Sequence, residues 1–111
     1  MKPGDIVLTV IPQDDQQKIR PVLILKILPR YNDFLVCAVS SQLHQHIPGF
    51  GLVLDTIHPA FAASGLRASS VFRLSNLAVL SKEEIIGTIG SLQKDLHLQL
   101  LKTLADYLLA G

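Results

Sequence analysis

The sequence lacks three features that would each place it in a particular class of protein. It has a single cysteine, so no disulfide can form within the chain, and the apolar neighbours of Cys37 predict a buried thiol. Its longest apolar stretch, residues 21–29, is interrupted by Lys26 and is far shorter than the roughly 20 residues of a membrane-spanning helix. Residues 1–10 do not have the order of a secretory signal. We therefore expect a cytoplasmic protein that makes no membrane contact.

An excess of charge of one sign is also missing. Ten Lys and Arg residues stand against nine Asp and Glu residues, which gives a formal net charge of +1. No overall positive field attracts nucleic acid, so polyanion binding requires a local cluster of basic side chains. The length of 111 residues and the 49% hydrophobic content predict one compact domain over residues 1–111, with some apolar surface left to cover a partner or a second subunit.

Most of the chain alternates short β-rich runs with turn residues, which predicts a small barrel or sandwich. Strands are expected at residues 5–11, 22–28, 34–41, 50–55, 70–80 and 85–92, the fifth being one bent strand or two short ones around Ser75 and Asn76. Residues 12–18 read as an exposed polar loop. A capping box at residues 81–84 indicates a helical turn. The fold class is thus mainly β with α (α+β).

The end of the chain has helical periodicity instead. Ser91 is suited to cap a helix, and one stripe holds Leu92, Leu96, Leu100, Leu104 and Leu108. His97 lies off this stripe and is expected on the surface. We expect this amphipathic helix to pack on the barrel.

Polar side chains emerge from three of the apolar strands. Arg20 enters the second strand, Ser40 and Ser41 leave the third, and Arg73 with Ser75 interrupts the fifth. In a small barrel such positions can converge at one mouth. The alternative is that the two arginines pair with a carboxylate such as Asp5, Asp55 or the chain terminus.

The ordered series GDIVL, RPVLIL, VCAVSS, SGLRASSVFRLSNLAVL and GTIGSL, followed by a leucine-rich helix, resembles the MazF/PemK toxins of type II toxin–antitoxin systems. The resemblance covers nearly the whole chain. It implies a homodimeric, SH3-like β-barrel that cuts single-stranded RNA without a metal or other cofactor and is inhibited by an antitoxin protein. In that family the ribose 2′-hydroxyl attacks the adjacent phosphate.

Carried over by position, the resemblance implies catalytic roles for Arg20, Ser40 and Arg73, because arginine forks hold phosphate oxygens and a hydroxyl can lie near the scissile phosphate. The residues expected to contact RNA are Gln16, Gln17, Lys18, Ser41, Arg67 and Ser75. From the sequence alone, Arg67 is equally well a turn residue.

The chain departs from the family pattern at the position of a carboxylate. Many members have aspartate two residues after the second arginine, where this chain has Ser75. Serine is not a general base near neutral pH without a base of its own. Asp14 or Asp15 offers a carboxylate in the 12–18 segment, where a solvated surface role is the alternative. A non-catalytic RNA- or protein-binding module on the same barrel therefore remains the second hypothesis.

Histidines suggest a third hypothesis, a metal-dependent hydrolase. His44 and His46 stand two residues apart, with Asp55 and His58 further on, and zinc accepts such donors. A tetrahedral site needs four well-placed donors, and the loop has no second close pair. A loop that contacts RNA or a partner explains these histidines as well.

Overall fold

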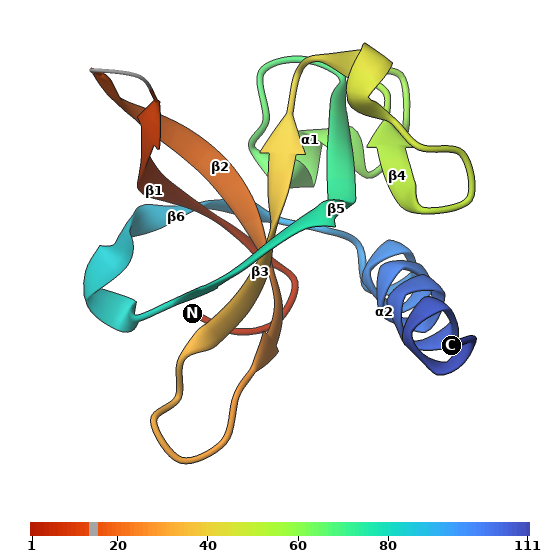
Figure 1. Ribbon diagram of the computed structural model, residues 1–111. Helices are drawn as coiled ribbons and strands as arrows, with labels where there is room; N and C mark the ends of the chain where they lie inside the picture. The colour runs from red at the N-terminus through yellow and green to blue at the C-terminus, as the bar shows by residue number, and fades with distance from the viewer. Residues whose placement is uncertain (14–15) are drawn as a thin grey trace.

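The computed structural model describes residues 1–13 and 16–111. Six strands form one antiparallel sheet with the order β4-β5-β3-β2-β1-β6. The elements are β1 (Asp5–Gln13), β2 (Gln16–Ile27), β3 (Phe34–Ser40), η1 (Leu43–Gln45), β4 (Gly51–Leu54), α1 (Phe61–Ser64), β5 (Ser70–Leu80), η2 (Lys82–Glu84), β6 (Ile85–Ser91) and α2 (Lys94–Leu109). The expected class, mainly β with a C-terminal helix, is confirmed. The sheet curves strongly, and β4 and β6 are its two edges (Figure 1).

Two apolar clusters lie on opposite faces of the central strands. Ile6, Leu23, Leu25 and Cys37 belong to the larger cluster, which also contains Leu100 and Leu104 of α2. Their chain neighbours Val7, Val22, Ile24 and Val36 belong to the smaller one. Because side chains alternate across a strand, burial on both faces explains why residues 22–25 are apolar without interruption. Cys37 is fully buried, which confirms the expected buried thiol, and this burial raises the pKa of the thiol to about 12.

The β1–β2 hairpin is longer than the sequence indicated. Residues 12–13 and 16–18, expected in an exposed loop, continue the two strands, with Pro12 opposite Gln17 and Gln13 opposite Gln16. The loop prediction was wrong here because backbone pairing continues past the last buried residue, where no alternation of apolar side chains marks it. The candidate carboxylates Asp14 and Asp15 lie outside the described residues.

The C-terminal helix also begins later than expected. Ser91 is the last residue of β6, and α2 starts at Lys94 after Gln93, whose side chain makes no capping hydrogen bond. His97 is buried rather than on the surface, and its Nε2 lies 3.1 Å from the carbonyl oxygen of Leu25. Leu108, expected on the packed stripe, is 68% exposed. No helix in residues 1–13 and 16–111 is long and apolar enough to cross a membrane.

Other local predictions agree with the structure. Ser81 and Glu84 form the expected capping box, in which the backbone N–H of Ser81 donates to the Glu84 carboxylate at 3.0 Å. Strand β5 is one continuous strand with an irregularity, as one of the two readings proposed. It spans the molecule from β4, near α2, to the turn that leads into β6 (Figure 1).

Candidate functional site

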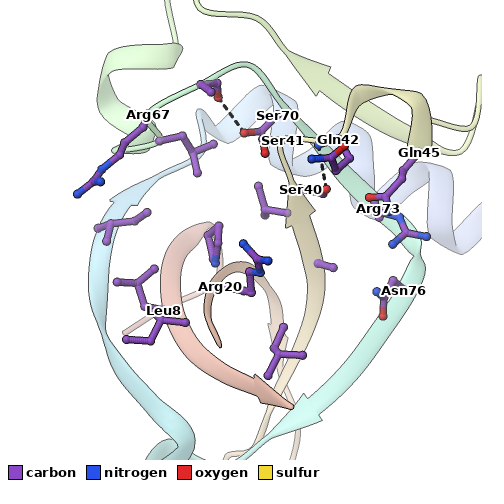
Figure 2. Close-up of a pocket in the computed structure, with 18 of the residues that line it drawn as sticks. Leu8, Arg20, Ser40, Ser41, Gln42, Gln45, Arg67, Ser70, Arg73 and Asn76 are labelled. Atoms are coloured by element: carbon purple, nitrogen blue, oxygen red, sulfur yellow. Dashed lines mark hydrogen bonds between the residues drawn. The ribbon is translucent and has the colours of Figure 1, made fainter. Parts of the chain in front are cut away.

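A groove of about 800 Å³ lies between the β1–β2 hairpin, the end of β3, the middle of β5 and the loop after α1. Its lining brings together side chains from segments far apart in the sequence: Arg20, Ser40, Ser41, Gln42, Gln45, Arg67, Ser70, Arg73 and Asn76. Figure 2 shows Arg20 in the middle of this lining, with Arg67 on one side and Arg73 on the other. Of the five polar strand positions expected to converge at one mouth, Arg20, Ser40, Ser41 and Arg73 do so, and Ser75 does not.

Arg20 lies on the part of β2 that pairs with β1 alone. It lies on β2 opposite Thr9 of β1, one residue before Pro21. Strand β3 pairs with β2 only from Val22 onward, so Pro21 stands where β2 has a partner strand on one side alone, a position at which proline is tolerated. A proline also favours an extended conformation in the residue before it. The exposed side chain of Arg20 is therefore held on an extended backbone at the groove.

Arg73 comes from the opposite wall and is partly buried. It lies on β5 opposite Ala38 of β3 and Gly51 of β4. Within the described part of the chain its Nε is buried without a hydrogen-bond partner. Two of the carboxylates proposed as alternative partners are engaged elsewhere: Asp5 binds Lys2 at 2.9 Å, and Asp55 accepts a hydrogen bond from Ser69 at 3.2 Å. Since an unmade hydrogen bond on a buried donor is costly, an anion in the groove would stabilise this side chain.

Ser40 forms a local turn at the end of β3. The backbone N–H of Gln42 donates to its Oγ at 3.0 Å (Figure 2). This contact uses a lone pair of the hydroxyl oxygen, so the O–H proton is available to donate. Ser40 is thus placed as a hydrogen-bond donor in the groove, and Ser41 follows it at the rim.

The other candidate RNA contacts are divided between the groove and its surroundings. Arg67, in the loop after α1, lines the groove and is exposed. Gln16, Gln17 and Lys18 are exposed on the projecting end of β2 and do not line it. Ser75 is exposed and also lies outside the lining, whereas the next residue, Asn76, is part of it. The sequence predicts only a bend or break of the strand at Asn76, because an asparagine in a strand more often marks a turn.

The groove has a one-sided charge. It contains three guanidinium groups, and among the described residues that line it none carries a carboxylate or an imidazole. The chemistry on offer is anion binding and stabilisation of negative charge by arginine, together with hydroxyl and amide hydrogen bonds.

The histidines are not arranged as a metal site. His58 Nδ1 accepts a hydrogen bond from the backbone N–H of Ala60 at 2.9 Å. His46 Nδ1 is buried without a partner among the residues described. In residues 1–13 and 16–111 no group of three or more His, Cys, Asp or Glu side chains lies close enough together to hold a metal ion.

The fold and the groove together define a small α+β protein with a cationic cleft against a bent antiparallel sheet. The chain matches the family of PemK-like, MazF-like toxins of type II toxin–antitoxin systems over residues 2–108, and it belongs to that family. Its structure is similar to that of the Mycobacterium tuberculosis toxin MazF-mt6, with a TM-score of 0.65 and 20% sequence identity over 92% of this chain and 95% of that one. At this identity the likeness establishes the fold alone. No curated protein matches the chain in a sequence search.

Proposed function

We propose that this toxin is an endoribonuclease that cleaves single-stranded RNA in the arginine-lined groove. The observation that carries the proposal is the convergence of Arg20, Arg67 and Arg73 in a groove whose described lining has no acidic side chain, in a chain of net charge +1. A cluster of this kind binds the phosphodiester backbone through charge-assisted hydrogen bonds. Family membership supports the toxin role and the assignment of RNA as the substrate class.

The reaction we propose is an internal transfer at one phosphate. The 2′-oxygen of the ribose forms a bond to the adjacent phosphorus, and the bond from phosphorus to the 5′-oxygen of the next nucleotide breaks. The products are a 2′,3′-cyclic phosphate and a 5′-hydroxyl. The proton lost by the 2′-hydroxyl is balanced by the proton gained by the 5′-oxygen, so the step needs no oxidant, reductant or added water.

The groove residues serve this step mainly through electrostatics and positioning. Arg20 and Arg73, from opposite walls, hold the phosphate oxygens and stabilise the additional negative charge of the transition state. The Ser40 hydroxyl, whose oxygen accepts from the backbone N–H of Gln42, donates a hydrogen bond to a phosphate oxygen. The described lining supplies no carboxylate or imidazole as a general base, so the arrangement favours charge stabilisation over proton transfer by a side chain of near-neutral pKa.

The proposal includes the assembly and the partners that the family resemblance implies. The protein would act in the cytoplasm as a homodimer of single-domain chains. A cognate antitoxin with an acidic segment would occupy the cationic groove and exclude RNA. The RNA substrate would be messenger RNA. No metal or other cofactor is required in this scheme.

The test is incubation of the purified protein with mixed-sequence RNA in EDTA. We expect discrete fragments that end in 2′,3′-cyclic phosphate. Arg20→Ala should abolish their formation, because the groove loses a central phosphate ligand, while thermal unfolding should show that the exposed side chain is dispensable for folding. Lys94→Ala, which removes a positive charge outside the groove, is the matched control and should retain full activity. Unimpaired cleavage by Arg20→Ala would remove Arg20 from the mechanism.

The lack of a carboxylate or imidazole in the described lining favours a second candidate, a binding module without catalytic activity. In that case the same incubation leaves RNA intact, but the RNA shifts on a native gel. Activity that disappears on chelation would instead support metal-dependent hydrolysis.

A further inference from the structure

Strand β5 contains an irregularity directly beside the catalytic candidate Arg73. Ala38 of β3 pairs with Arg73, and the preceding β3 residue, Cys37, pairs with Leu77. Residues 74–76 of β5 thus stand between two pairs whose β3 members are adjacent. Such bulges bend a strand and change the direction of side chains, and they occur often next to active sites. In a regular strand residues 74 and 76 would face the same side of the sheet. Here Leu74 is buried in the core, whereas Asn76 lines the groove.

Asn76 is exposed, and no hydrogen bond of its side chain occurs among the described residues. Gln45, from η1, lines the same part of the groove. Figure 2 shows Arg73 between these two carboxamides. An anion-binding guanidinium is therefore flanked by two amide groups, each with a donor and an acceptor in one plane.

A carboxamide can donate an N–H to a phosphate oxygen, but that contact leaves its own carbonyl oxygen without a hydrogen-bond donor. It is well suited to the edge of a nucleobase, which presents donors and acceptors side by side, and its most frequent bidentate partner is adenine. Single-stranded RNA exposes these edges when its bases are splayed out. Pro21 and Leu66 provide apolar surface in the groove against which a base face can pack.

We infer that Asn76 is a specificity-determining residue that hydrogen-bonds the edge of one base, with adenine as the expected base, beside the phosphate held by Arg73. This inference rests on the proposed RNA substrate. The bulge at residues 74–76 has the role of bringing Asn76, rather than Ser75, to the groove. Gln45 supports the same base from the other side of Arg73.

The experiment maps cleavage sites of the wild-type protein and two variants on a randomised RNA pool by sequencing the new ends. The wild type should favour adenine over the other bases at one position by about 5- to 100-fold, the discrimination of one bidentate contact. Asn76→Ala should reduce that preference to less than about threefold at this position alone. Asn76→Asp replaces the amide donor by a second acceptor and should shift the preference toward guanine, whose N1–H and N2–H groups are adjacent donors.

Gln99→Ala, which removes an exposed carboxamide on α2 that does not line the groove, is the matched control and should keep the wild-type profile. The inference is overturned if both Asn76 variants keep the wild-type preference at every position, including the case in which cleavage falls uniformly at all sequences. The absence of cleavage by the wild type would count against the proposed function instead. The same pool, separated into bound and unbound RNA, would then test the base preference by binding.

Discussion

Two polar side chains, Arg73 and His97, lie among apolar neighbours but have different environments. Arg73 faces a groove, whereas His97 is buried between α2 and the sheet, where its Nε2–H donates to the carbonyl oxygen of Leu25. Burial lowers the pKa of His97 below its usual value, since the charged form loses water, and Lys26 nearby acts in the same direction. The hydrogen bond to Leu25 opposes part of this shift.

This environment predicts a pH dependence of stability. Well above pH 6.5, about the usual pKa of histidine, the side chain is neutral in both the folded and the unfolded protein. As the pH falls below this value the unfolded chain takes up a proton first, so the free energy of unfolding decreases until the pH reaches the lower pKa of the folded state. His97→Gln keeps an N–H donor for Leu25 but does not titrate. The difference in unfolding free energy between wild type and variant, measured with urea, should therefore shift against the wild type between pH 7.5 and pH 5.5. Parallel pH profiles would contradict the assignment.

The same two residues show which features of the molecule the sequence could predict. Arg73 was recognisable because a charge in an apolar strand requires a partner or a ligand. His97 was missed because it lies off the leucine stripe, and its burial depends on how closely the first turn of α2 approaches β2. That approach is a tertiary contact without a local sequence signal.

At the scale of the elements, the wall of the groove that carries Arg67 depends on close packing between α1 and β6. A Cβ at Gly90 would overlap backbone atoms of Ala63 and Ser64. At Gly87, on the same strand, a Cβ would meet no atom within 4 Å. The absence of a side chain at Gly90 thus lets the segment that precedes Arg67 lie directly on the sheet.

These two glycines form a matched pair for a test. Gly90→Ala should destabilise the protein by about 1–3 kcal/mol, because α1 or β6 must shift to accommodate the methyl group. Gly87→Ala should change the free energy of unfolding by less than about 0.5 kcal/mol. Both variants reduce the entropy of the unfolded chain equally, so their difference isolates the packing effect. Urea unfolding of the two proteins measures it, and equal stabilities would show that α1 does not need this contact.

Most strands could be predicted because burial produces recognisable runs. Strands β3 and β4 fall within a residue or two of the expected ranges, since apolar residues begin and end with them. The hairpin beyond residue 11 could not be predicted, because exposed paired strands have polar residues on both faces. For the same reason, the sequence did not predict that Arg20 lies in the interior of β2 rather than at its start.

At the scale of the whole molecule, the important property is the separation of charge rather than its sum. Lys and Arg exceed Asp and Glu by one, yet three arginines line one groove. The acidic side chains with described partners bind elsewhere, as in the pairs Lys2–Asp5 and Lys102–Asp106. A nearly neutral protein can therefore hold a polyanion at one surface without a strong overall field.

This separation predicts a moderate salt dependence of RNA binding. The affinity is measured for a single-stranded oligonucleotide that has 2′-deoxy residues and cannot be cleaved by 2′-hydroxyl attack. With about three phosphate contacts, log K should fall with log[salt] with a slope of about −2, because single strands release about 0.7 counterions for each contact. Arg67→Ala should make the slope shallower by about 0.7, whereas Lys94→Ala should leave it unchanged, since only Arg67 lines the groove. An equal effect of the two substitutions would mean that RNA responds to the net charge of the chain, and the groove would then not be its binding site.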